Sequence, residues 1–232
     1  MVHNKKALIA AMGLFAALAG GNASAALTLT EVTLTGTNVS YTFYQEDLGL
    51  FGTASLSGDE LVFTPLSSGF AASSDGSPAA NHLINVTVSA HTGYLLTAFN
   101  LNEQGGYSLT GEDASVYVSG YLGALDIEGN TSNYLDSSLQ PVLANGTWKA
   151  SAGVTLPATG WGGADGMVSS VSLAISNDLF AYSESGSASI YKNFVGLTVV
   201  TAPIPEAETY AMMLAGLGLV GFMARRRARS QI

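Results

Sequence analysis

The sequence predicts an all-β body, an antiparallel β-sandwich or jelly roll, from three observations. Apolar and polar residues alternate along residues 27–34, 39–43 and 84–88, as they do in strands with one buried face. Glycine-containing turn signals such as Ser57-Gly58-Asp59 separate these stretches. No stretch between residues 26 and 203 shows the 3.6-residue period of a helix. Short strands at this spacing favour an antiparallel sandwich over a parallel α/β fold.

Six further strands are expected in the same body. They are residues 60–64, 94–102, 114–121, 147–156, 168–175 and 189–200. Turns are expected at Asp75-Gly76, Glu103-Gln104-Gly105-Gly106, Glu128-Gly129-Asn130, Asn145-Gly146 and Asp165-Gly166. The chain length of 232 residues suits one such domain, at residues 26–201, between two targeting segments.

The charges of the chain are unevenly distributed. The whole sequence has a net charge of −9, but most of its basic residues lie at the two ends. Between Ala26 and Ile204 only Lys149 and Lys192 oppose fifteen acidic residues, which gives a net charge of −13. Binding to a phosphate backbone requires Lys or Arg, so nucleic acid is excluded as a partner. The chain has no cysteine, which excludes disulfides, thiolate catalysis and cysteine-ligated metals.

Residues 1–25 have the three parts of a secretory signal peptide. A positive start at Lys5 and Lys6 precedes an apolar stretch at residues 7–19, which we expect to be helical. Ala23-Ser24-Ala25 then forms an A-x-A cleavage site, so cleavage is predicted before Ala26. The expected partners of this segment are the secretory translocon and signal peptidase. The alternative is a short buried helix.

Residues 202–232 form a second targeting segment. Pro203 and Pro205 prevent a helix from extending backward into the body. Residues 210–224 are apolar and span about 22 Å as a single helix, which is short for a membrane span. Basic residues follow this stretch and would hold its end on the cytoplasmic side. They are Arg225, Arg226, Arg227 and Arg229.

The order of these parts resembles the PEP-CTERM sorting signal of Gram-negative bacteria. The resemblance rests on Pro205-Glu206-Ala207-Glu208-Thr209-Tyr210, the apolar stretch at 214–222 and the arginine-rich end, with Ala207 in place of the motif's second proline. It implies recognition by an exosortase, a membrane-embedded cysteine transpeptidase that cuts near Pro205 and Glu206. The apolar helix would then anchor the chain in the inner membrane transiently, before release to the cell surface or the medium. An ordinary C-terminal anchor is the alternative.

The same resemblance implies a role outside the cell. Proteins with this tail usually occur in bacteria that make exopolysaccharide and grow as biofilms or flocs. We therefore expect a structural or adhesive matrix protein, with exopolysaccharide as a candidate partner.

The body lacks the residue pattern of a hydrolase, so we expect no enzymatic activity. Only His82 and His91 remain after signal removal, and there is no G-x-S-x-G elbow. Adjacent carboxylates such as Glu46-Asp47 point to opposite faces of a strand, which favours solvated turns over a glycosidase pair. A surface hydrolase is the least favoured of the three function classes.

Two ligand sites are weighed against structural roles. Asp126, Glu128 and Asn130 resemble part of a calcium loop, because hard cations take several oxygen ligands, and no other cofactor is expected. Trp161 lies among glycines and is a candidate platform for stacking a sugar in a carbohydrate-binding module. The alternatives are a solvated acidic turn and packing of Trp161 in the core.

Overall fold

The computed structural model describes residues 29–66, 69–129, 133–204 and 212–221. Several predicted features lie outside these ranges, so they stay predictions. They are the signal peptide at 1–25 with Ala23, Ala25 and Ala26, together with Asn130, Pro205, Glu206, Arg225, Arg226, Arg227 and Arg229.

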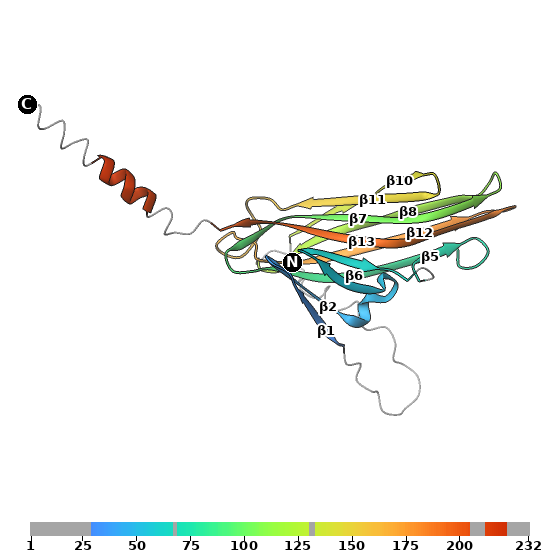
Figure 1. The fold of residues 1–232 in the computed structure, drawn as a ribbon, viewed down its shortest axis with the longest axis horizontal. Coiled ribbons are helices and arrows are strands. Elements are labelled where there is room, and N and C mark those ends of the chain that lie inside the picture. Colours follow the sequence, from blue (N-terminus) through green and yellow to red (C-terminus); the bar gives the residue numbers. More distant parts are fainter. Residues whose placement is uncertain (1–28, 67–68, 130–132, 205–211, 222–232) are drawn as a thin grey trace, which may run out of the picture.

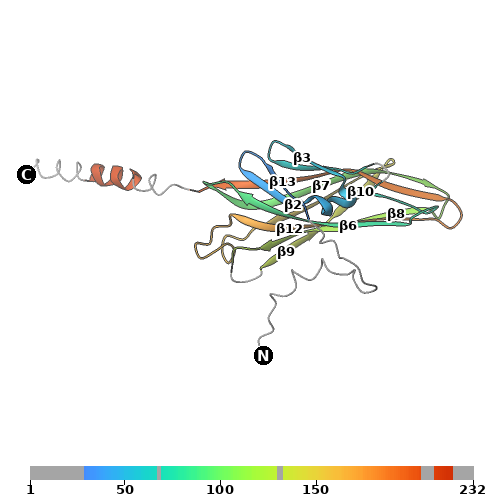
Figure 2. The same cartoon turned by 90° about the horizontal axis from the view of Figure 1, so that it is seen from below.

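The body is an elongated sandwich of two antiparallel sheets (Figure 1). Six-stranded sheet A has the order β1 (Glu31–Thr35), β2 (Val39–Tyr44), β6 (Ala79–Ala90), β12 (Ser170–Tyr182), β8 (Ser115–Asp126) and β9 (Tyr134–Ser138). Seven-stranded sheet B has the order β10 (Gln140–Ala144), β11 (Thr147–Thr155), β7 (Tyr94–Thr110), β13 (Ser187–Pro203), β4 (Glu60–Thr64) and β3 (Thr53–Ser57), with β5 (Ala71–Ser73) also paired to β13. Figure 2 shows β13 and β7 in one layer and β12, β6, β8 and β9 in the other. The predicted all-β sandwich is confirmed.

Alternation of side chains explains why the two sheets face each other. Along β12, every second residue is buried from Val171 through Leu173 and Ile175, while Ser172 and Ala174 point outward. Each fully buried aliphatic side chain contributes about 1.5–3 kcal/mol relative to an exposed one. The inward side chains of both sheets form a single hydrophobic core.

The longest pairing joins β7 to β13 in the middle of sheet B. A β-bulge between Lys192 and Phe194 changes which residues of β13 face the core. Before the bulge the buried positions are Ala188, Ile190 and Lys192, and after it they are Val195, Leu197 and Val199. The bulge therefore places Lys192 at the last inward position of its half of the strand.

The structure corrects the sequence prediction at several strands. Strands β3, β5, β9 and β10 were not predicted. The turn predicted at Glu103-Gln104-Gly105-Gly106 is wrong, because these residues lie inside β7. A glycine is required at position 105 because a Cβ there would lie 1.9 Å from the carbonyl oxygen of Tyr191. The glycine pair thus marks close packing of strands and not a chain reversal.

Helical structure is limited in the described residues. A short 3-10 helix, η2 (Gln45–Phe51), buries Leu48 and Phe51 against the sandwich. Residues 212–221 are helical and exposed, within the stretch where a single apolar helix was predicted. Within the described ranges, no helix has both the length and the apolar character that a membrane crossing requires. The transient membrane anchor stays a prediction.

Candidate functional site

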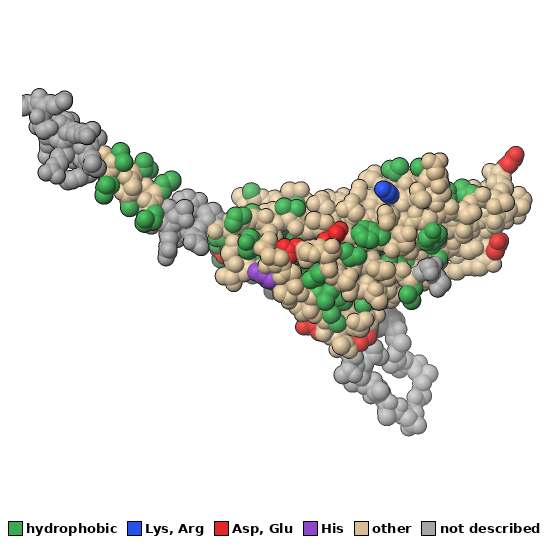
Figure 3. All heavy atoms as spheres, viewed as in Figure 1, with side chains coloured by type: hydrophobic (Ala, Val, Ile, Leu, Met, Phe, Trp, Pro, Cys, Tyr) green, Lys and Arg blue, Asp and Glu red, His purple; other side chains and the backbone are tan. Residues whose placement is uncertain are grey.

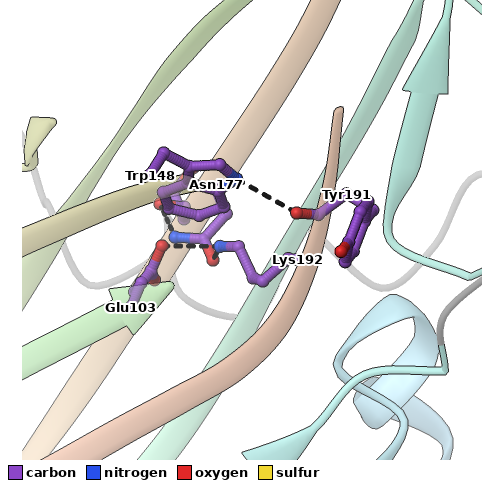
Figure 4. A network of polar contacts seen from close by, with 6 residues as sticks. Glu103, Trp148, Asn177, Tyr191 and Lys192 are labelled. Carbon is purple, nitrogen blue, oxygen red and sulfur yellow. Dashed lines mark hydrogen bonds and ion pairs between the residues drawn. The ribbon is translucent and has the colours of Figure 1, made fainter. Parts of the chain in front are cut away.

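A cluster of three polar side chains lies between the two sheets, inside the core (Figure 4). Glu103 comes from β7 and Lys192 from β13, both in sheet B, whereas Asn177 comes from β12 in sheet A. Their exposed fractions are 2%, 0% and 1%, respectively. Burial of charged and amide groups is costly unless they pair with one another, so this placement requires an explanation.

The lysine amine is the centre of the cluster. Nζ of Lys192 lies 2.6 Å from Oε2 of Glu103, and it also donates to Oδ1 of Asn177. The Asn177 amide is oriented by its own donor, because Nδ2 donates to the carbonyl oxygen of Ser176 at 2.7 Å. Oε1 of Glu103 is buried and has no hydrogen-bond partner among the described residues. The cluster therefore brings an amine, a carboxamide and a carboxyl group into contact.

Aromatic rings surround the amine. Nζ of Lys192 lies 4.6 Å from the ring centroid of Phe70, 5.6 Å from that of Trp148 and 5.9 Å from that of Phe51. These distances are within the range of cation–π attraction. The indole Nε1 of Trp148 donates to the carbonyl oxygen of Tyr191 at 3.0 Å, which holds its ring in place (Figure 4). The walls of the cluster are thus largely aromatic.

Burial shifts both ionisable groups toward their neutral forms. It raises the pKa of the Glu103 carboxyl, although the charge of Lys192 opposes the shift. It lowers the pKa of the Lys192 amine, although the charge of Glu103 opposes that shift. Both shifts lower the free-energy cost of moving a proton from the amine to the carboxylate.

Local sequence explains how the cluster is built. Gly105 pairs with both Lys192 on β13 and Trp148 on β11. A Cβ at Gly105 would lie 2.5 Å from the indole Nε1 of Trp148, so only glycine lets that ring lie across β7. The bulge after Lys192 completes the arrangement by ending the inward run of β13 at the lysine.

Sequence reasoning missed all three residues, although a signal for them exists. Each polar residue occupies the inward phase of an alternating strand, as Asn177 does between Ile175 and Leu179. Lys192 follows Ile190 in the same phase, and Glu103 follows Leu101. A polar residue at an apolar position of a strand indicates a buried partner. The mistaken turn at residues 103–106 concealed the signal at Glu103.

The predicted calcium residues have other partners in the described structure. Oδ1 of Asp126 accepts from the backbone N–H groups of Glu128 and Gly129 at 3.0 and 3.1 Å, and Oδ2 accepts from Gly162 at 3.0 Å. The Glu128 carboxylate accepts from the N–H and the hydroxyl of Ser169. Asn130 lies outside the described residues. In the ranges that the structure describes, no group of three or more His, Cys, Asp or Glu side chains is placed to hold a metal ion.

Trp161 packs in the core. Its exposed fraction is 5%, and it belongs to the same hydrophobic cluster as the inward residues of the sheets. This burial corrects the interpretation of Trp161 as an exposed stacking platform and agrees with the core-packing alternative. A Trp flanked by glycines is not necessarily exposed, because residues distant in the sequence can cover it.

A groove of about 460 Å³ lies on the face of sheet A that points away from sheet B. Its lining includes the aromatic side chains of Tyr44, Tyr121 and Tyr134 and the polar side chains of Asn85 and Thr87. Tyr134 and Tyr44 have exposed fractions of 49% and 41%. Partly exposed aromatic rings beside polar side chains can bind a ligand that has both apolar and hydrogen-bonding faces.

Comparison with known protein families gives a match at the C-terminal end of the chain. The PEP-CTERM protein-sorting motif matches residues 203–227. No curated protein and no solved structure matched this chain. The match begins at Pro203, the last residue of β13, which pairs with Tyr94. The chain therefore carries the PEP-CTERM protein-sorting motif, which confirms the resemblance and makes it an exported protein that an exosortase processes for sorting to the cell surface.

Proposed function

We propose that the mature protein is a non-enzymatic structural or adhesive component of the cell surface or extracellular matrix, associated with exopolysaccharide in biofilms. One observation carries the proposal: the sorting motif begins at the last residue of the last strand of the sandwich. The whole sandwich therefore precedes the sorting signal and would be delivered as one folded unit.

The predicted cut near Pro205 and Glu206 is compatible with an intact sandwich. Strand β13 ends at Pro203, and the N–H of Ile204 still donates to the carbonyl oxygen of Gly93 at 2.8 Å. A cut beyond Ile204 removes no strand and no core residue of the described body. The released protein would keep both sheets and the net charge of −13 between Ala26 and Ile204.

The placement of titratable side chains supports a non-enzymatic role. The Glu103–Lys192 pair is buried, so a dissolved substrate could not reach it. The ring of His82 pairs with the backbone carbonyl of Asp47, and the ring of His91 pairs with Ser40 and the carbonyl of Thr37. In these contacts neither histidine is oriented by a carboxylate, as a hydrolytic triad would require. On the face shown in Figure 3, backbone and uncharged polar side chains occupy most of the area, and charged side chains are few.

Fractionation of the producing bacterium tests this function. We expect the protein in the surface or extracellular fraction, with a C-terminus close to Ile204 by mass spectrometry, and in the inner membrane when the exosortase gene is deleted. Glu206→Ala should impair release, whereas Glu208→Ala serves as the matched control. Retention of the mature protein in the inner membrane with an active exosortase would contradict the proposal.

We propose saccharide binding in the groove of sheet A as a second candidate function. Aromatic faces stack on the apolar faces of sugar rings, and amide and hydroxyl groups bind sugar hydroxyls. Tyr134 and Tyr44 supply the rings, and Asn85 and Thr87 supply the polar groups. This groove takes the place of Trp161 in the carbohydrate-binding hypothesis.

Retention of the protein on the host's own exopolysaccharide tests the second candidate. Tyr134→Ala should weaken binding about 2- to 10-fold, which corresponds to the loss of one aromatic contact. Tyr117→Ala is the matched control, because Tyr117 is 59% exposed and does not line the groove. Equal retention of the wild type and Tyr134→Ala would reject the groove as the binding site.

A further inference from the structure

We propose that Lys192 and Asn177 are joined by an intramolecular amide bond between Nζ and Cγ, which covalently crosslinks the two sheets, and that Glu103 is the acid–base group that forms it. The inference stands on the geometry of the buried cluster and goes beyond the proposed function. It does not depend on where the protein is sorted or on what it binds.

The first support is the position of the reacting atoms. Nζ of Lys192 contacts Oδ1 of Asn177, so the amine lies beside the carboxamide carbon that it would attack. Oε2 of Glu103 lies 2.6 Å from the same nitrogen. Because folding already holds the nucleophile, the electrophile and the proton carrier in contact, the reaction does not bear the entropy cost of bringing them together.

The second support is the rigidity of the strands that carry these groups. Asn177 is on β12, which pairs with β6 on one side and β8 on the other. Lys192 and Glu103 are on the long β7–β13 ladder in the middle of sheet B. The backbone carbonyl of Ser176 accepts from Nδ2 of Asn177, which directs Oδ1 toward the lysine. Both reacting side chains are therefore carried by strands that are hydrogen-bonded to a neighbour on each side.

The third support is the protonation that burial favours. A lysine amine is a nucleophile only when it is neutral, and a carboxyl group can polarise a carbonyl only when it holds a proton. Burial raises the pKa of Glu103 and lowers that of Lys192, so both shifts favour the reactive forms. The rings of Phe70, Trp148 and Phe51 exclude water that would stabilise the charged pair.

The reaction balances without any further reactant. A proton passes from Lys192 to Glu103, and the lone pair of Nζ then adds to Cγ of Asn177 while the protonated carboxyl group stabilises the oxygen. Glu103 next carries a proton from Nζ to Nδ2. The Cγ–Nδ2 bond breaks, its electron pair leaves with the nitrogen, and one molecule of ammonia is released. No oxidant or reductant is involved, and Glu103 ends in its protonated form because it keeps the proton that the lysine ammonium lost in the first step.

The crosslink would give this chain a covalent link that it cannot obtain from disulfides. The sequence contains no cysteine. The proposed bond ties β13 to β12, and β13 is the strand that leads into the sorting motif at Pro203. A bond at this place joins the exit strand of the sandwich to the opposite sheet.

Mass spectrometry of the denatured full chain tests the proposal. The chain is purified from a host without an exosortase, which leaves its C-terminus intact. Lys192 is the only lysine or arginine between residues 150 and 224, so trypsin would cut a free Lys192 and yield the peptides 150–192 and 193–225. With the bond in place, trypsin cannot cut there. We expect a single peptide, 150–225, lighter than its sequence by one ammonia molecule.

Variants separate the roles of the three residues. Asn177→Asp should still form the bond but lose water in place of ammonia, relative to its own sequence. Glu103→Gln should keep Lys192 free, because it removes the proton carrier and changes little in shape. Lys149→Met, at the other lysine of the body, should retain the mass deficit in full.

The outcome is decided on the wild-type chain, so a variant that fails to fold does not affect it. Cleavage after Lys192, with peptides of full sequence mass, would overturn the crosslink. A complete mass deficit in a folded Glu103→Gln chain would overturn the role of Glu103 and leave the bond itself supported.

Discussion

The two faces of sheet A differ in the chemistry that they present. The inward face meets sheet B and carries Asn177 into a dry cluster with Lys192 and Glu103. The outward face carries a groove that is lined in part by Tyr134 and Tyr44. Solvent cannot reach the polar groups on the inward face, so they can interact only with other groups of the same protein. Only the outward face is available to an external ligand.

The largest effect is expected from a change in the interior. Lys192→Met removes both the partner of the buried Glu103 carboxyl and the nitrogen of the proposed crosslink, which should lower the free energy of unfolding by about 3–5 kcal/mol. Denaturant unfolding measures it. Lys149→Met, at an exposed position, should stay within about 0.5 kcal/mol of the wild type. Similar losses in the two variants would show that the interior cluster has no special role in stability.

The next effect concerns the glycine behind the cluster. In Gly105→Ala the new Cβ would meet the carbonyl oxygen of Tyr191 and the indole of Trp148, so the unfolding free energy should fall by about 1–3 kcal/mol. Gly76→Ala is the matched control, because nothing lies within 4 Å of a Cβ at that position. Thermal unfolding of the two variants is compared. An unfolding free energy of Gly105→Ala equal to that of the wild type would show that the strands can move apart at no cost.

Asp126 tests whether a buried carboxylate at the end of β8 serves the fold or a metal. Asp126→Ala leaves three backbone N–H groups without their acceptor, so stability should fall by about 1–3 kcal/mol. We expect the same loss in calcium and in chelator. A calcium-dependent rise in the wild-type melting temperature that Asp126→Ala abolishes would instead support the calcium site predicted from the sequence.

A smaller effect is expected at Tyr41, which is buried in β2. Burial, and then the charges of Asp59 and Glu60, raise the pKa of its hydroxyl far above the usual value. The folded state therefore binds the proton more tightly than the unfolded state. The stability that this hydroxyl contributes is fully present below the unfolded-state pKa of about 10 and is lost as the pH rises above that value.

Tyr41→Phe tests the origin of this alkaline sensitivity. The variant should lose about 1 kcal/mol at neutral pH, because the hydroxyl no longer donates to the carbonyl oxygen of Asp59. It should also lose less additional stability above pH 10 than the wild type does. Tyr117→Phe, at an exposed tyrosine, is the control. Parallel profiles of stability against pH for the wild type and Tyr41→Phe would show that Tyr41 is not the source of the alkaline loss of stability.

The strands were predictable where alternation is regular and long. Strand β4 (Glu60–Thr64) and most of β2 and β11 agree with the predicted ranges within a residue or two. The short edge strands β9 and β10 were missed, because their outward and inward residues differ little in polarity. Strand β7 was cut short at Asn102, because Gly105 and Gly106 are typical of turns when they are taken without their neighbours.

The sequence by itself determined the class of the fold and the destination of the chain. Both follow from short-range patterns in the sequence. The class of the fold follows from the period of two that gives a strand one buried face, and the destination follows from the linear order of Pro-Glu, apolar stretch and arginines. The match at residues 203–227 covers the Pro-Glu pair, the apolar stretch and the first three of these arginines.

Only the tertiary structure decided which polar residues meet. Glu103, Asn177 and Lys192 lie on three strands and in two sheets, and their contact depends on the register of β7 with β13 and on a bulge after Lys192. The same holds for Trp161, which is buried by residues that its own glycine-rich segment does not contain. Alternation specifies which face a side chain takes, whereas the pairing of distant strands specifies what it finds there.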